Sequence, residues 1–251
     1  AHGPMPLLLI MLYCLAWTFS NPSLRHASVW LLNFLLIYTG FGLFIGLITP
    51  ALYVLDGVLA YKRNERRAAA IALAGLLVSL ASIGSFFVNY VFAPAASDFR
   101  LADPFIRGYI LFVSIALSNF WGLKTLSPST CAVGLFTFFL MVSVLAFHTV
   151  ILMLGKSKID KTRSRVIAIL ITFTLIFLVN SSVGRISLGF SAGQSSRYIT
   201  YMIPGIFGLY LAMSAMRRSW PGWAIAILLV AATIPVRKDD LLGMTKTKEY
   251  K

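Results

Sequence analysis

The sequence VIAILITFTLIFLVNSSV at residues 166–183, followed by GRISLGFSAGQSSRY at residues 184–198, decides the class of fold. The first stretch carries no charged residue. Its length is close to the roughly 20 residues that a helix needs to cross a bilayer. A second apolar stretch, residues 199–216, follows the polar segment. The pattern therefore predicts two membrane-spanning helices joined by a polar connection.

The whole chain has the composition of an integral membrane protein. Of its 251 residues, 59% are hydrophobic and 12% are charged, and the mean hydropathy is +0.84. Soluble domains have about 45–50% apolar and about 25% charged residues. Further apolar stretches lie at residues 5–19, 28–60, 68–92, 105–122, 131–154 and 223–234. We therefore expect an all-α, polytopic transmembrane helix bundle of about 7–9 apolar helices over residues 1–236, and a polar, extracytoplasmic tail at residues 237–251.

One apolar stretch, residues 28–60, is too long for a single ordinary span. Glycine at position 40 suggests a hairpin of two short helices, residues 28–39 and 41–60. One long tilted helix is the alternative, because glycine and proline also occur inside membrane helices. The polar residues at 21–26 predict a break in the chain before this hairpin.

The formal net charge of +14 would suggest nucleic-acid binding in a soluble protein. Here the lysines and arginines cluster in short loops beside apolar stretches, where they set orientation in the membrane. No basic stripe with interleaved aromatic residues is present, so we reject nucleic acid as a partner. The two cysteines and three histidines show neither a disulfide framework nor metal-ligand spacing. No cofactor is therefore predicted.

The basic clusters also predict which loops share a side of the membrane. Clusters at 62–67, 156–165 and 217–218 should all be cytoplasmic. Three apolar stretches separate the first two clusters, so one of the three must fail to cross. Residues 105–122 carry Arg107 and several polar residues, and we expect this segment to be re-entrant or to lie along the outer face.

With this orientation, the polar segment 184–197 and the loop 93–130 face outward, together with His2. Arg185 and Arg197 then flank one outward segment, and arginine presents a fork of donors suited to phosphate. The glycines between them would let backbone N–H groups approach an anion. The alternative is that both arginines only meet lipid headgroups.

Two carboxylates, Asp98 and Asp103, lie on the outward loop. A carboxylate can act as a general base or hold a divalent metal, so these two are the candidate catalytic residues. A local salt bridge with Arg100 is the alternative. Asp56 is more readily explained by a snorkelling or paired structural role, and His148 by a contact between helices.

The pattern Gly184-Arg185, then Gly189, then Ser196-Arg197-Tyr198 resembles a large group of uncharacterised bacterial multi-spanning membrane proteins similar to the GT-C glycosyltransferase superfamily. His2 before two prolines, at the start of a short span, also resembles that group. The resemblance implies transfer of sugar from a polyprenyl-phosphate carrier at the outer face of a bacterial inner (plasma) membrane. It implies that Arg185, Arg197 and Tyr198, with His2, bind the carrier phosphate, and Arg107 is a further outward cation for the same role.

One departure from that superfamily concerns catalysis. Its members carry an acidic residue in the first outer loop, and the loop after residues 5–19 has none. If this chain is an interior piece of a longer protein, the acidic residue would lie upstream of Ala1. Three hypotheses therefore stay open: a lipid-linked-sugar glycosyltransferase, a binding or transport protein for a lipid-linked or anionic substrate, and a non-catalytic membrane subunit.

Cysteine labelling tests the predicted orientation. Ser127→Cys and Ser191→Cys, each in a chain whose two native cysteines are replaced by alanine, should both react with a membrane-impermeant thiol reagent added outside. Labelling of only one of the two positions would refute the re-entrant or surface location of residues 105–122.

Overall fold

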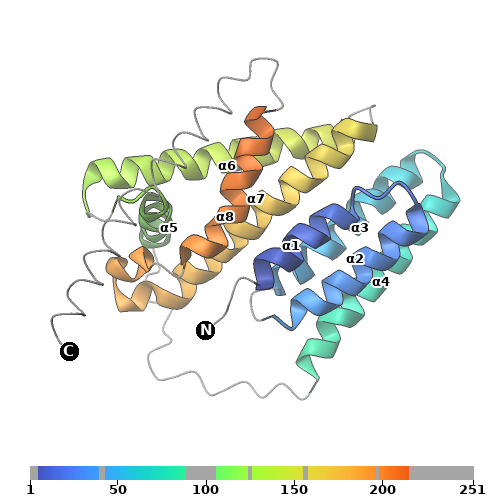
Figure 1. Ribbon diagram of the computed structural model, residues 1–251, viewed down its shortest axis with the longest axis horizontal. Coiled ribbons are helices and arrows are strands. Elements are labelled where there is room, and N and C mark those ends of the chain that lie inside the picture. Colours follow the sequence, from blue (N-terminus) through green and yellow to red (C-terminus); the bar gives the residue numbers. More distant parts are fainter. Residues whose placement is uncertain are drawn as a thin grey trace, which may run out of the picture. The chain divides into compact units, whose positions relative to one another are not determined.

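A computed structural model of the 251-residue chain describes residues 5–39, 43–88, 106–123, 126–154, 158–195 and 198–214. All regular structure within these residues is helical (Figure 1). The α-helices are α1 (Met5–Ala16), α2 (Pro22–Ile37), α3 (Leu43–Lys62), α4 (Arg66–Phe87), α5 (Ile106–Phe120), α6 (Pro128–Leu154), α7 (Lys158–Arg185) and α8 (Ile199–Ser214). Two short 3₁₀-helices, η1 (Ile186–Leu188) and η2 (Phe190–Gln194), lie between α7 and α8.

Four of these helices, α3, α4, α6 and α7, are long and apolar enough to cross a membrane. They contain 20, 22, 27 and 28 residues, and about 20 residues span the hydrocarbon core. The all-α class is thereby confirmed for the described residues, and these four helices suggest a membrane protein, as the composition predicts. The helix count for the whole chain and the re-entrant segment stay predictions, and the apolar stretch 223–234 and the tail lie outside the described residues.

The long apolar stretch 28–60 is divided between two helices, as the hairpin interpretation requires. The helix α2 ends at Ile37 and α3 begins at Leu43, while Gly40 lies outside the described residues. The break in the chain before this hairpin lies at residues 17–21, between α1 and α2, and the polar residues Arg25 and His26 are already part of α2. The Asn21 side chain accepts hydrogen bonds from the backbone N–H groups of Ser23 and Leu24 at 2.9 and 3.3 Å, and Pro22 occupies a first-turn position where its missing N–H costs nothing.

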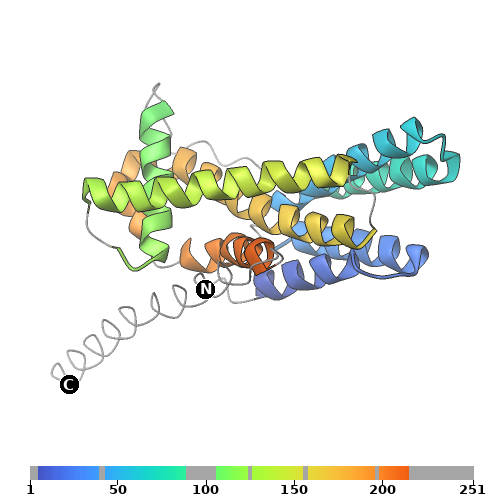
Figure 2. The same cartoon turned by 90° about the horizontal axis from the view of Figure 1, so that it is seen from above.

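The chain divides into two compact units. Unit 1 contains Ala1–Asp98 and Leu145–Phe177, and unit 2 contains Phe99–Val144 and Leu178–Lys251. In unit 1 the pair α1–α2 packs against the pair α3–α4 (Figures 1 and 2). The close approach depends on glycine, because a Cβ on Gly75 of α4 would overlap the Tyr53 ring of α3. A Cβ on Gly46 would lie 3.0 Å from Ile37 Cγ1.

A chain of buried hydrogen bonds joins three helices of unit 1. The Tyr13 hydroxyl on α1 lies 2.8 Å from Thr49 Oγ1 on α3, and Thr49 donates to Asn33 Oδ1 on α2 at 2.7 Å. All three side chains are at most 1% exposed. Because an unpaired polar group costs free energy in an apolar interior, these bonds fix the register of the three helices.

In unit 2 the polar residues of α5 face inward. Ser114, Ser118 and Asn119 are buried, and Ser114 Oγ donates to the backbone oxygen of Cys131 at 2.6 Å. Figure 2 shows α5 crossing the first part of α6. At that crossing a Cβ on Gly134 would overlap the backbone of Ser114. Three of the polar residues that distinguish 105–122 from an ordinary span, Ser114, Ser118 and Asn119, are therefore explained by packing within the unit.

Gly134→Ala should destabilise unit 2, because the added methyl group meets backbone atoms that cannot rotate away. Overpacking of this kind costs about 1–3 kcal/mol. The matched control is Gly84→Ala on α4, where a Cβ would meet nothing within 4 Å and the higher helix propensity of alanine should leave stability unchanged or slightly raised. The measurement is the thermal midpoint of the detergent-purified chain. Equal midpoints for the two variants would contradict the close crossing.

Candidate functional site

The described residues contain three of the seven predicted site residues. Arg107, Arg185 and Tyr198 belong to unit 2. The candidate phosphate-binding residues His2 and Arg197 and the candidate catalytic residues Asp98 and Asp103 lie outside the described residues. The predicted roles of these four residues stay predictions.

Arg185 and Tyr198 are brought together at the end of α7. The guanidinium carbon of Arg185 lies 5.7 Å from the centre of the Tyr198 ring, within the range of a cation–π interaction. Tyr198 is 4% exposed and Arg185 is half-buried. Arg185 is the last residue of α7, where a positive charge also interacts favourably with the helix dipole. Within the described residues, no carboxylate pairs with Arg185.

The segment between Arg185 and Tyr198 is a folded connection rather than an open loop. Its two 3₁₀-helices pack along α5. The Asn119 side-chain amide donates to the backbone oxygen of Gln194 at 2.9 Å, and Gly193 is buried where a Cβ would lie 3.3 Å from the Phe112 oxygen. Gly189 has a φ of 88°, a conformation that favours glycine. These contacts hold the connection in one course beside α5.

Arg107 is exposed in the first turn of α5. Among the contacts of the described residues, none joins Arg107 to Arg185 or Tyr198. The described part of the chain also contains no group of three or more histidine, cysteine or acidic residues that could hold a metal ion. Of the residues predicted to bind phosphate, the described part of unit 2 therefore brings together Arg185 and Tyr198.

Unit 1 contains a second polar centre: Trp17, His26, Tyr53, Asp56 and Arg165, here called the aromatic–ionic cluster. Arg165 Nη2 lies 2.5 Å from Asp56 Oδ1, and the Arg165 guanidinium stacks over the Trp17 ring at 4.4 Å from its centre. The Arg165 and Asp56 side chains are only 18% and 24% exposed. Partial burial strengthens such a pair, since water screens it less.

His26 joins this cluster from the second turn of α2. Its Nδ1 lies 3.1 Å from the Tyr53 hydroxyl, and its ring contacts Trp17 edge to face at 6.3 Å between centres. Burial lowers the pKa of His26, and the positive charge of Arg25 lowers it further. Since the ordinary value is about 6.5, the imidazole of His26 is neutral at pH 7.

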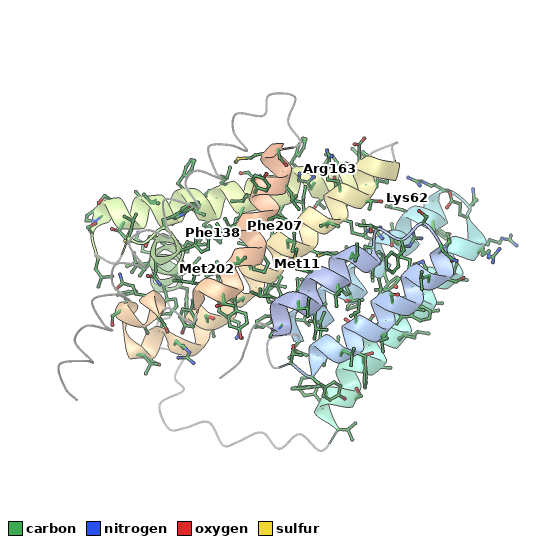
Figure 3. All side chains as sticks on the ribbon, in the orientation of Figure 1. Met11, Lys62, Phe138, Arg163, Met202 and Phe207 are labelled. Carbon is green, nitrogen blue, oxygen red and sulfur yellow. The ribbon has the colours of Figure 1, made fainter. Side chains whose placement is uncertain are left out.

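The Asp56–Arg165 pair also places two basic segments at one end of unit 1. Asp56 lies near the C-terminal end of α3, and Arg165 lies near the start of α7. Figure 3 shows Lys62 and Arg163 at this same end. That the clusters 62–67 and 156–165 share the cytoplasmic side of the membrane stays a prediction.

Sequence reasoning gave Asp56 a snorkelling or paired structural role, and the structure shows the pair. The nearest basic residues in the chain are Lys62 and Arg63, yet the partner is Arg165, which is 109 positions away. The signal available was the presence of one acid and one arginine near the ends of two apolar stretches. The other isolated polar residue, His148, does contact a neighbouring helix, with Nδ1 lying 2.9 Å from Ser164 Oγ.

A double-mutant cycle on Asp56→Ala and Arg165→Ala tests the ionic pair. Residues in direct contact couple by roughly 0.5–3 kcal/mol, so the double variant should be less destabilised than the sum of the single variants. The cycle of Asp56→Ala with Arg63→Ala is the matched control and should be additive. The measurement is the free energy of unfolding in mixed detergent micelles, and additivity in both cycles would refute the pair.

The two polar centres differ in what they offer a ligand. The aromatic–ionic cluster satisfies its charges internally through the Asp56–Arg165 pair, whereas Arg185 contacts an aromatic ring and keeps its charge unneutralised by any described carboxylate. Arg185 is therefore the better candidate for an anionic ligand.

Comparison of this chain with models of protein families, with curated proteins and with solved structures finds no match.

Proposed function

We propose that this chain is a multi-pass protein of a bacterial inner (plasma) membrane that handles a polyprenyl-phosphate-linked sugar at the outer face of the membrane, by glycosyl transfer. The observation that carries the proposal is the Arg185 guanidinium held over the buried Tyr198 ring, 5.7 Å from its centre. It lies where two apolar helices, α7 and α8, meet a folded polar connection. The reaction class rests on the resemblance of Gly184-Arg185 and Ser196-Arg197-Tyr198 to GT-C proteins.

The geometry of Arg185 suits a phosphate at a membrane surface. The Tyr198 ring faces the guanidinium carbon, so the N–H groups at the edge of the guanidinium plane stay available. Two parallel N–H groups match two phosphate oxygens, and such charge-assisted bonds are about twice as strong as neutral ones. An ammonium group cannot reproduce this fork, because its donors radiate from one atom.

In the proposed reaction an acceptor hydroxyl attacks the anomeric carbon of the sugar, and the bond from that carbon to the carrier phosphate breaks. Arg185, with Arg197, stabilises the negative charge that develops on the phosphate. Asp98 or Asp103 takes the proton from the attacking hydroxyl as general base. Membrane lipid and the lipid-linked sugar are the partners of this proposal.

Substituting arginine by lysine separates a phosphate site from a topology signal, because lysine keeps the charge. Arg185→Lys should weaken binding of undecaprenyl phosphate to the purified full-length chain about tenfold, which corresponds to about 1.4 kcal/mol. Native mass spectrometry with a lipid titration measures the affinity. Arg163→Lys, at an exposed position in unit 1, is the matched control. Unchanged affinity in a chain carrying both Arg185→Lys and Arg197→Lys would overturn the proposed phosphate site.

The carboxylate variants distinguish catalysis from binding alone. Asp98→Asn and Asp103→Asn should leave carrier binding unchanged, while one of them reduces release of radiolabelled sugar from a polyprenyl-phosphate donor by about a hundredfold or more. The full-length chain in proteoliposomes is the sample, with Arg163→Lys again as control. Sugar release at the normal rate in both variants would exclude these two residues as the general base.

A further inference from the structure

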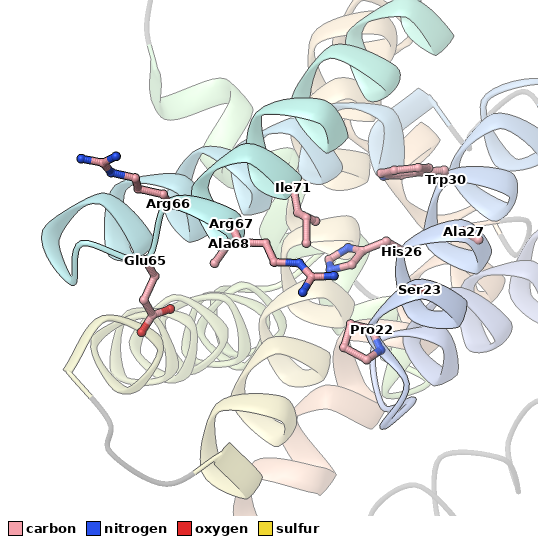
Figure 4. Close-up of a pocket in the computed structure, with 10 residues that line it drawn as sticks. All are labelled: Pro22, Ser23, His26, Ala27, Trp30, Glu65, Arg66, Arg67, Ala68 and Ile71. Carbon is pink, nitrogen blue, oxygen red and sulfur yellow. The ribbon is translucent and has the colours of Figure 1, made fainter.

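Unit 1 contains an open pocket of about 910 Å³ between the first turns of α2 and the first turns of α4 (Figure 4). Ser23, His26 and Trp30 line it from α2, and Arg67 and Ile71 line it from α4. Its lining residues belong to unit 1, whereas the Arg185–Tyr198 contact belongs to unit 2. None of the roles proposed above uses it.

The lining changes from polar to apolar with depth. Both helices begin at the pocket, so a higher residue number along either helix lies further from its polar end. Ser23 and Arg67 belong to the first turns, whereas Trp30 and Ile71 lie one to two turns deeper. A ligand that fits such a gradient has a polar head and an apolar body.

The polar end of the pocket is suited to an anion. Figure 4 shows the Arg67 and His26 side chains reaching toward one another from α4 and α2, whereas the Glu65 and Arg66 side chains, which also line the pocket, point away from that pair. Among the described residues, no carboxylate pairs with Arg67. The His26 Nδ1 already faces the Tyr53 hydroxyl. A neutral imidazole that accepts from this hydroxyl carries its proton on Nε2, which makes it a hydrogen-bond donor.

The start of α4 adds to this preference for negative charge. Asn21 caps the start of α2 with its side chain, but Glu65 makes no side-chain hydrogen bond to the first turn of α4. The first N–H groups of a helix carry partial positive charge, which an anion stabilises when no side chain caps them. Since Arg66 and Arg67 exceed the single carboxylate of Glu65 in the lining, the pocket keeps a net positive charge and favours a phosphate over a neutral head.

We propose that this pocket binds the phosphate group of a membrane lipid, with Arg67 and His26 holding the phosphate and with Trp30 and Ile71 contacting the first part of the apolar chain. The basic residues 62–67 thus do more than orient the protein in the membrane. One of them, Arg67, is a ligand-binding residue, whereas Arg63 lies outside the pocket lining.

The test measures binding of dioleoyl phosphatidate to the full-length chain in nonionic detergent by native mass spectrometry. Arg67→Gln removes one strong donor pair, and His26→Ala removes the second donor, so each should weaken binding about tenfold. Arg63→Gln makes the same change of charge in the same basic segment and should alter the affinity by about twofold at most. Thermal midpoints of all variants show whether each one is folded, and Arg67→Lys replaces Arg67→Gln if the latter does not fold.

Two further titrations separate a lipid from free phosphate. Dioleoyl phosphatidylcholine has the same chains but a zwitterionic head, and it should bind at least about tenfold more weakly than phosphatidate. Inorganic phosphate should compete only weakly, because it lacks the apolar contacts with Trp30, and Trp30→Ala should reduce the affinity for phosphatidate but not for phosphate.

Three results would overturn the proposal. An equal loss of affinity in Arg63→Gln and Arg67→Gln would show that phosphatidate is held by the general positive charge of the basic segment and not by the pocket. Equal binding of phosphatidate and phosphatidylcholine would show that the net negative charge of a phosphate head group is not recognised, which contradicts the proposed roles of Arg67 and His26. Inorganic phosphate that binds as tightly as phosphatidate would make the ligand a soluble anion.

Discussion

The contact of Arg165 with Asp56 and Trp17 is the interaction on which the arrangement of unit 1 depends. It joins the start of α7 to the end of α3 and to the residue that follows α1. A charge in an apolar setting needs a partner, because its desolvation costs several kcal/mol per ion. Asp56 and Arg165 satisfy one another, and the Trp17 ring covers the guanidinium. The pair thereby fixes which helix ends meet.

The buried hydrogen bonds of unit 1 follow the same physical rule. Apolar side chains can slide past one another in a lipid-like interior at little cost, so they specify the register of helices weakly. Polar groups specify it strongly, because each must find its partner. The bonds of Thr49 with Tyr13 and Asn33 therefore set the positions of α1, α2 and α3, and glycines at 46 and 75 permit the close approach. In unit 2 the contacts of Ser114 and Asn119 have the same effect.

These constraints place two sets of basic residues in different chemical settings. Arg165 is neutralised by a neighbouring carboxylate, and its role is structural. Arg185 and Arg67 have no described carboxylate partner and lie beside an aromatic ring or in a pocket. Local sequence does not distinguish them, since all three flank apolar helices. The surroundings in the folded chain separate an arginine that supports the fold from one that is available to a ligand.

The amino-acid sequence by itself determined the all-α class and the apolar composition of a membrane protein, because hydropathy acts locally. It favoured the division of residues 28–60 into two helices over one long helix, and it gave Asp56 a snorkelling or paired role. It also placed Arg185 and Tyr198 at the two ends of one polar connection. Only the tertiary structure decided that Arg165 is the partner of Asp56 and that His26 and Arg67 line one pocket. Helices that are apolar on nearly every face carry little information about which face meets which neighbour. Those contacts are set by a few polar groups and glycines that pair across long distances in the sequence.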